Sequence, residues 1–201
     1  MKLFLKSIAY LFHPIFVPTA GTILYFFVTP RYVPIETQGS NLLPIFILTV
    51  IIPIISFFIL KNLGIVNSVA MTDTTERKYP LYICISLLFM IIYKVIPTNY
   101  TPELYYYFIG LLAALTFSLT LVFFKYNPSI HMIGIGSLLM YLINLSIHFE
   151  KNLTLSISIF LICTGLVASS RLYFRTHNKL ELVIGLCIGI ITQFLTIKFW
   201  L

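Results

Sequence analysis

The stretch LPIFILTVIIPIISFFIL, residues 43–60, contains no charged side chain and is nearly long enough to cross a bilayer as a helix. A spanning helix needs about 20 consecutive, predominantly apolar residues. Further apolar runs, bounded by proline, asparagine or charged residues, predict six more segments at 7–29, 80–96, 104–124, 130–147, 153–170 and 180–200. The first of these contains Pro14 and Pro18, which would kink it or make it re-entrant. We therefore expect an all-α integral membrane protein, a bundle of six to seven transmembrane helices forming a single domain over residues 1–201.

The composition excludes an ordinary soluble domain. Hydrophobic residues make up 59% of the chain and charged residues 9%, against about 45–50% and about 25% in soluble domains. The net charge of +7 is spread thinly, without a long basic run, so nucleic-acid binding is not expected. Because Cys84, Cys163 and Cys187 lie within apolar runs and lack metal-ligand spacing, we interpret them as small core residues. The sequence contains no metal-ligand cluster, and we expect no metal and no cofactor.

Three polar connections carry most of the functional information, since ionisable residues at membrane depth are costly and usually functional. Their sequences are MTDTTERKYP at 71–80, KYNPSIH at 125–131 and SSRLYFRTHNKLE at 169–181. Two predicted spans separate the first connection from the second, and two more separate the second from the third. All three must then lie on the same membrane face, which predicts one shared active site at one membrane interface.

The second connection has the composition of an anion-binding helix start. Pro128 and Ser129 are suited to begin and cap a helix. The backbone N–H groups of Ile130 and His131 would then point out of the helix toward an anion, and His131 can donate a proton to a leaving group. The alternative is a capped helix with an interfacial histidine. His13, beside Pro14, similarly either lines a cavity or lies at the interface.

The third connection pairs residues four apart, Arg171 with Arg175 and His177 with Glu181. In a helical turn each pair shares a face. A carboxylate at that spacing can fix the imidazole tautomer, leaving the other ring nitrogen free to attack phosphorus, and arginine binds phosphate oxygens in bidentate fashion. The alternatives are a solvated basic loop and, for Glu181, a helix-capping box with Asn178.

The first connection supplies Arg77 and Lys78 just before Pro80. These two basic residues either snorkel toward the headgroups or hold an anion together with the other connections. Further along the chain, Gly185 and Gly189 are spaced for close helix packing.

These residues resemble a known family. Pro128-Ser129-Ile130-His131 resembles the Pro-Ser-Gly-His motif of the type 2 phosphatidic acid phosphatase superfamily, whose members are membrane lipid phosphatases. Ser170-Arg171, five residues, His177, three residues and Glu181 resemble its Ser-Arg-x5-His-x3-Asp motif with the spacing intact. Arg77-Lys78-Tyr79-Pro80 stands where the family has Lys-x6-Arg-Pro, without a lysine seven positions before Arg77. The resemblance covers about residues 70–195.

The resemblance implies a metal-independent hydrolase acting on a phosphomonoester or diphosphate of a lipid. It implies that His177 is the nucleophile that forms a phosphohistidine, that Glu181 orients it and that His131 is the general acid. It also implies a set of phosphate-binding residues: Arg171, Ser129, Ile130, Arg77 and Lys78. The implied partner is a lipid phosphate in the bilayer, and the expected location is a bacterial inner (cytoplasmic) membrane.

Two other classes of function remain open. Ile130 replaces the glycine of the family motif and Glu181 replaces its aspartate. These departures suit a non-catalytic relative that binds a lipid phosphate or serves a structural role. A small transporter or channel fits less well, because the ionisable residues gather at one face instead of along a path through the midplane.

Overall fold

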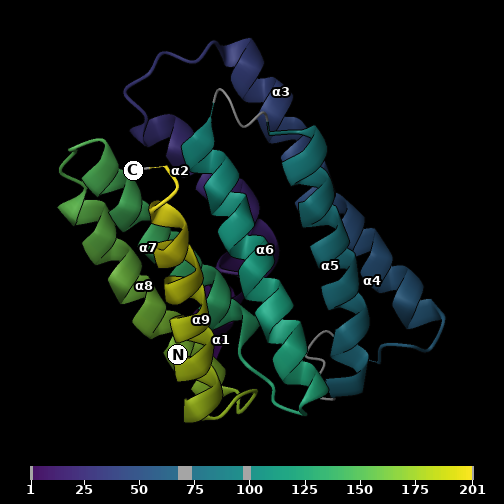
Figure 1. Ribbon diagram of the computed structural model, residues 1–201. Helices are drawn as coiled ribbons and strands as arrows, with labels where there is room; N and C mark the ends of the chain where they lie inside the picture. The colour runs from purple at the N-terminus through teal and green to yellow at the C-terminus, as the bar shows by residue number, and fades with distance from the viewer. Residues whose placement is uncertain (1, 68–73, 97–100, 201) are drawn as a thin grey trace.

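The computed structural model describes residues 2–67, 74–96 and 101–200, and this part of the chain forms a helical bundle without strands (Figure 1). The connection residues 71–73 lie outside the described residues. The elements are α1 (Lys2–Leu11), the short 3-10 turn η1 (Pro14–Phe16), α2 (Val17–Val28), α3 (Ile35–Phe46), the π-helical turn η2 (Ile47–Ile51), α4 (Ile52–Asn62), α5 (Thr74–Lys94), α6 (Pro102–Phe123), α7 (Ile130–His148), α8 (Thr154–Tyr173) and α9 (Lys179–Ile197).

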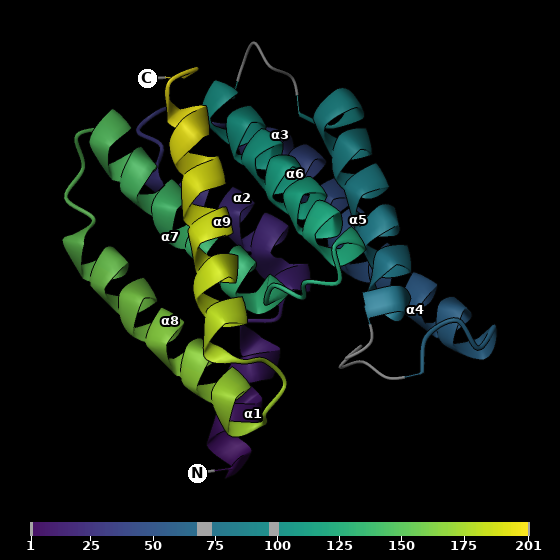
Figure 2. The same ribbon diagram turned by 60° about the horizontal axis from the view of Figure 1, so that its bottom comes forward.

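The expectation of an all-α membrane bundle is confirmed. Six helical stretches of the described residues are long and apolar enough to cross a membrane: 2–28, 35–62, 102–123, 130–148, 154–173 and 179–197. The predicted segment at 80–96 corresponds to α5, which carries Glu76, Arg77 and Lys78 near its start and is not among the six. It lies beside α6 in both ribbon views (Figures 1 and 2).

Helix α7 forms the centre of the bundle, with twelve of its 19 residues buried. Helix α7 packs closely against α9 because two glycines of α9 lie directly against backbone atoms at the start of α7. A Cβ on Gly185 would lie 2.6 Å from the Ser129 carbonyl oxygen, and one on Gly189 would clash with the carbonyl oxygen of Ile133. Asn144 then donates to the Gln193 carbonyl at 3.0 Å across the same interface. The predicted role of Gly185 and Gly189 in close helix packing is confirmed.

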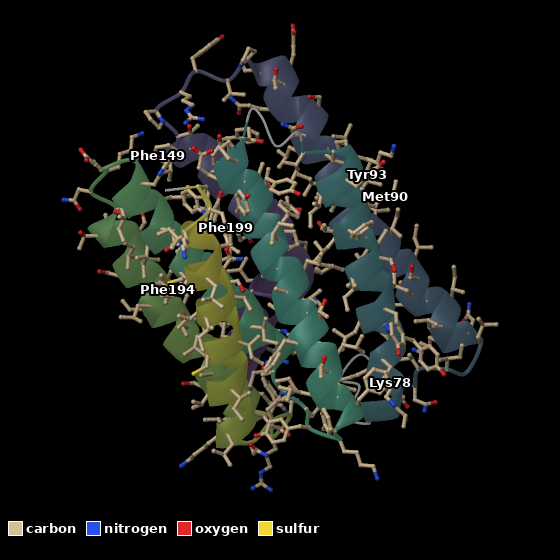
Figure 3. All side chains as sticks on the ribbon, viewed as in Figure 1. Lys78, Met90, Tyr93, Phe149, Phe194 and Phe199 are labelled. Atoms are coloured by element: carbon tan, nitrogen blue, oxygen red, sulfur yellow. The ribbon has the colours of Figure 1, made fainter. Side chains whose placement is uncertain are left out.

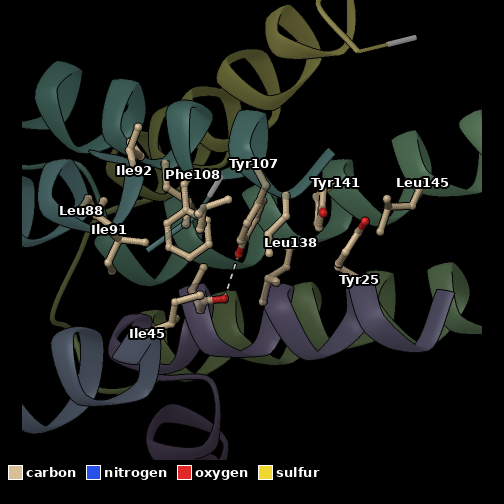
Figure 4. Packing of buried hydrophobic residues seen from close by; sticks show 14 of the residues in the cluster. Tyr25, Ile45, Leu88, Ile91, Ile92, Tyr107, Phe108, Leu138, Tyr141 and Leu145 are labelled. Carbon is tan, nitrogen blue, oxygen red and sulfur yellow. Dashed lines mark hydrogen bonds between the residues drawn. The ribbon is translucent and has the colours of Figure 1, made fainter. Parts of the chain in front are cut away.

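Aromatic side chains fill the core between α2, α6 and α7 (Figure 4). Tyr107 and Tyr141 are fully buried and stack with their ring centroids 4.2 Å apart. The Tyr107 hydroxyl donates to the Val17 carbonyl at 2.8 Å, the bond drawn dashed in Figure 4. The outer faces expose Met90 and Tyr93 on α5 and Phe194 on α9 (Figure 3). In a membrane protein such apolar outer faces are solvated by lipid.

The fold brings the described parts of the three polar connections to one end of the bundle, the lower end in Figure 1. The start of α5, the loop from α6 to α7 and the loop from α8 to α9 all lie there, as the counting of spans predicts. The α7–α8 loop and the end of α9 lie at the opposite end.

Candidate functional site

Arg77 joins the three connections. It lies near the start of α5 and is only 6% exposed. Its Nη1 donates to the Pro128 carbonyl at 3.1 Å, and its Nη2 lies 3.0 Å from Nε2 of His177. Because a guanidinium only donates hydrogen bonds, Nε2 of His177 is the acceptor, and the neutral ring carries its proton on Nδ1.

The end of α8 determines where His177 lies. Arg175 adopts a left-handed backbone conformation with φ 51°, and the N–H of Thr176 donates to the Arg171 carbonyl at 3.2 Å. This turn reverses the chain and directs it back toward the bundle. Burial lowers the pKa of His177, and the positive charges of Arg77 and Arg171 lower it further, to about 4. The ring is therefore neutral near pH 7, with the Nε2 lone pair directed at Arg77.

Ser129 lies at the start of α7, held against the start of α9. Its backbone N–H donates to the Glu181 carbonyl at 3.1 Å, and its carbonyl accepts the first helical bond of α7 from Ile133. The side chain makes no capping bond, although the residue is fully buried. Its hydroxyl thus remains available to a ligand at the helix terminus, where the dipole favours an anion.

Unsatisfied polar atoms gather at this end of the bundle. Within the described residues, five buried side-chain atoms here have no hydrogen-bond partner: Asn127 Oδ1, Ser129 Oγ, His131 Nε2, Arg171 Nε and His177 Nδ1. Leaving such groups buried and unpaired costs free energy, so their concentration in one place indicates a binding site. Arg171 Nε and His177 Nδ1 are donors and the Ser129 hydroxyl can donate, and the charge of Arg171 acts on both His131 and His177. The set is suited to an oxyanion.

Glu181 does not contact His177 as the spacing suggested. Its carboxylate accepts from the N–H of Asn178 at 2.9 Å, and its own N–H donates to Asn178 Oδ1 at 2.9 Å, forming a capping box at the start of α9. Helix α9 begins after Asn178, so His177 precedes the helix and the rule for residues four apart does not apply to it. The expectation that Glu181 orients His177 is therefore wrong. Glu181 caps α9 instead, which is the alternative that the sequence left open.

The side chains of Lys78 and Ile130 also lie elsewhere than the phosphate-binding positions that the resemblance implied. The ammonium of Lys78 lies 4.7 Å from the centroid of the Phe123 ring, a cation–π contact at the lower end of α5 and α6 (Figure 3). Consecutive helical residues do not face the same side, so α5 presents Arg77 to the site and Lys78 to α6. The Ile130 side chain lines a small apolar cavity of about 40 Å³ with Pro14 and Leu111. Any contact of Ile130 with an anion would therefore involve its backbone N–H.

His13 is a site residue that the motifs did not indicate. Its ring packs edge to face against the ring of His131, with centroids 5.1 Å apart. The sequence left open whether His13 lines a cavity or lies at the interface, and its side chain lines a cavity of about 240 Å³ with Phe16 and Phe160. The helix break at Pro14 does not predict the contact with His131. The N-terminal segment therefore contributes to the same cluster as the three connections.

A second polar cluster occupies the opposite end of the bundle; we call it the opposite-end cluster and define it as Glu103, Arg31, His148 and Tyr25. Glu103 is fully buried, with Arg31 Nη2 at 3.3 Å and His148 Nε2 at 3.1 Å from its Oε1. The Tyr25 hydroxyl donates to Oε2 at 3.4 Å. Because its carboxylate oxygens are occupied by these partners, we interpret this cluster as structural.

In the part of the chain that the structure describes, no group of three or more His, Cys, Asp or Glu side chains is arranged to hold a metal ion. Comparison with protein-family models, with curated proteins and with solved structures finds no match to this chain. A functional assignment must therefore come from the geometry of the residues themselves.

Proposed function

We propose that this chain is a metal-independent membrane phosphatase that hydrolyses a phosphomonoester or diphosphate of a lipid through a phosphohistidine intermediate. The observation that carries the proposal is the contact of buried Arg77 with both His177 and Pro128, among five unpartnered buried polar atoms. The resemblance of residues 128–131 and 170–181 to the motifs of the type 2 phosphatidic acid phosphatase superfamily supports the same assignment.

In the proposed first step, Arg77, Arg171 and the Ser129 hydroxyl bind the phosphate oxygens and stabilise the charge that develops on them. The lone pair on Nε2 of His177 attacks phosphorus, and the P–N bond forms as the P–O bond to the lipid breaks. The electron pair of that bond stays on the departing oxygen, which takes a proton from His131. Burial and the charge of Arg171 disfavour protonation of this ring, so in the proposed step the negative charge of the bound phosphate favours the protonated form. The low pKa of His177 favours this step because the ring is unprotonated at neutral pH.

In the second step, water attacks phosphorus of the phosphohistidine and the P–N bond breaks. One proton of the water returns to His131, while His177 regains its lone pair and inorganic phosphate leaves. Every proton is then accounted for by the two histidines and water, so the cycle requires no further co-reactant.

The place of the site in the bundle suits a lipid headgroup. The cluster lies at the helix ends, where a phosphate at the membrane surface can enter while its hydrocarbon chains stay between the lipid-facing helices. The proposed location is a bacterial inner membrane, with the lipid phosphate as the partner. Phosphatidic acid, phosphatidylglycerol phosphate, undecaprenyl diphosphate and lipid A phosphates are the candidate substrates.

The test is phosphate release by the purified protein in detergent, with a chelator present, across a panel of those lipids. We expect release from at least one lipid, and its loss in His177→Ala with an unchanged elution profile and helical circular dichroism. Activity retained in His177→Ala would reject the nucleophile. No release from any lipid by well-folded protein would reject the phosphatase.

A non-catalytic lipid-phosphate receptor is the second candidate. It is favoured by the capping role of Glu181, which leaves Nδ1 of His177 without a partner among the described residues. Native mass spectrometry of the same preparation separates the two. Retained lipid phosphate without turnover, lost in Arg77→Gln, would support the receptor.

A further inference from the structure

The N-terminal helix is interrupted at a histidine that caps the next turn. Helix α1 ends at Leu11, and His13 is extended, with φ −66° and ψ 135°. Its Nδ1 accepts a hydrogen bond from the N–H of Ile15 at 3.4 Å. This bond restrains the ring and leaves Nδ1 unprotonated, so the neutral ring carries its proton on Nε2.

Gly134 permits the close approach of this segment to α7. A Cβ at Gly134 would lie 2.7 Å from Cγ2 of Val17 and 3.7 Å from Cα of Pro14. Gly134 follows His131 by three positions, so both lie on the same face of α7. The missing side chain thus allows the turn at Pro14 to lie against α7, where the His13 ring meets the His131 ring at 5.1 Å and an interplanar angle of 82°.

The same segment contacts the other elements of the site. The Ser170 hydroxyl, next to Arg171, donates to the Leu5 carbonyl at 2.8 Å and fastens α1 to α8. The His131 ring donates a hydrogen bond to the backbone carbonyl of Ala9. The Nε2 atom of that ring has no partner among the described residues. The orientation of His131 therefore depends on contacts from the N-terminal segment.

We infer that His13 is a positioning residue that holds the His131 ring in the orientation needed to protonate the leaving group. The inference rests on the proposed phosphatase function and adds a residue outside the three motifs to that site. A general acid contributes to the rate only while it lies within hydrogen-bond reach of the oxygen that it protonates. The edge-to-face contact limits rotation of the His131 ring, and the bond to Ile15 limits rotation of the His13 ring in turn.

Two substitutions separate ring packing from capping. His13→Phe keeps an aromatic ring against His131 and loses the acceptor for Ile15. His13→Asn keeps a side-chain acceptor for Ile15 and loses the ring. Each variant is assayed with the best lipid substrate, whose alkoxide leaving group needs a proton, and with p-nitrophenyl phosphate, whose leaving group needs none.

We expect His13→Asn to lower kcat on the lipid about tenfold, part of the 10²–10⁴-fold contribution of a general acid. We expect KM to stay unchanged and the rate on p-nitrophenyl phosphate to change less than about twofold, because that reaction does not use the acid. We expect His13→Phe to stay within about threefold of the unmodified protein on both substrates, since it retains the ring contact.

A rate on the lipid that is unchanged in His13→Asn would overturn the inference, as would an equal loss on both substrates. Loss of activity in His13→Phe alone would show that only the cap matters, which also overturns it. These outcomes require an active unmodified protein. An unmodified protein inactive on both substrates would reject the phosphatase itself, and the role of His13 with it.

Discussion

At the residue scale, the contact between Arg77 and His177 bears on both binding and reactivity in the proposed mechanism. The guanidinium approaches Nε2 of His177 at 3.0 Å and also lowers the pKa of that ring, though less than burial does. A phosphate oxygen entering the site would take over donors from this arginine. In the proposed mechanism, the same side chain would therefore bind the anion and keep His177 unprotonated.

Arg77→Gln should abolish most of the activity, while Lys78→Gln should leave it nearly unchanged. Removing the buried arginine that we propose holds the transferring phosphoryl group should lower kcat/KM by about 10²–10³-fold, the effect of losing a donor in such sites. Lys78 contacts Phe123 instead of the site. Phosphate release by the two variants, prepared in parallel, measures the difference. Equal losses of activity in the two variants would contradict the placement of Arg77 in the site and of Lys78 outside it.

The pKa of His177 should be measurable by NMR titration of labelled histidine rings, with His177→Ala assigning the signal. Burial, Arg77 and Arg171 lower this pKa to about 4, so the ring is neutral at higher pH and becomes protonated as the pH falls through that value. The proposed nucleophile, the unprotonated His177 ring, is then lost only at low pH. Arg77→Gln removes one positive charge and should raise the pKa. A pKa near 6.5 in the unmodified protein would contradict the buried position.

At the element scale, the interface of α7 and α9 sets the distance between the helix starts that carry the site. Gly185 lies against the Ser129 carbonyl, and the Ser129 N–H reaches the Glu181 carbonyl. The two helices therefore approach closely at the end where His131 and His177 lie. Any side chain inserted between them should separate those histidines.

Gly189→Ala should destabilise the bundle, whereas Gly165→Ala should not. A Cβ at Gly189 would clash with the Ile133 carbonyl oxygen, while one at Gly165 meets nothing within 4 Å. Overpacking of this kind costs about 1–3 kcal/mol, and an unhindered glycine-to-alanine change within a helix gains up to about 1 kcal/mol. Thermal unfolding in detergent compares the two variants. A lower Tm for Gly165→Ala than for Gly189→Ala would contradict the packing.

At the scale of the whole molecule, apolar periodicity and the counting of spans predict the helices and bring three distant connections to one end. These features depend on hydrophobicity and length, which are local properties of the chain. The place of Glu181 depends on where α9 begins, and the capping box at Asn178 decides that. The contact of His13 with His131 depends on the space left at Gly134, which is a tertiary property. Sequence patterns therefore place Arg77, His131 and His177 at one end of the bundle, and they single out His13, but they do not predict its contact with His131.

We propose that the two ends of the bundle have different roles, and one substitution tests this division. Glu103→Gln removes the carboxylate that binds Arg31 and His148 in the opposite-end cluster. We expect a loss of about 3 kcal/mol in unfolding free energy, the low end for a broken buried pair, because the Arg31 side chain is 53% exposed. Exposed Glu36→Gln is the control and should have no effect. Phosphate release per folded molecule, measured well below the Tm, should stay the same in both variants. If Glu103→Gln lowered that rate without lowering the Tm, the opposite-end cluster would belong to the functional machinery and the two ends would be coupled.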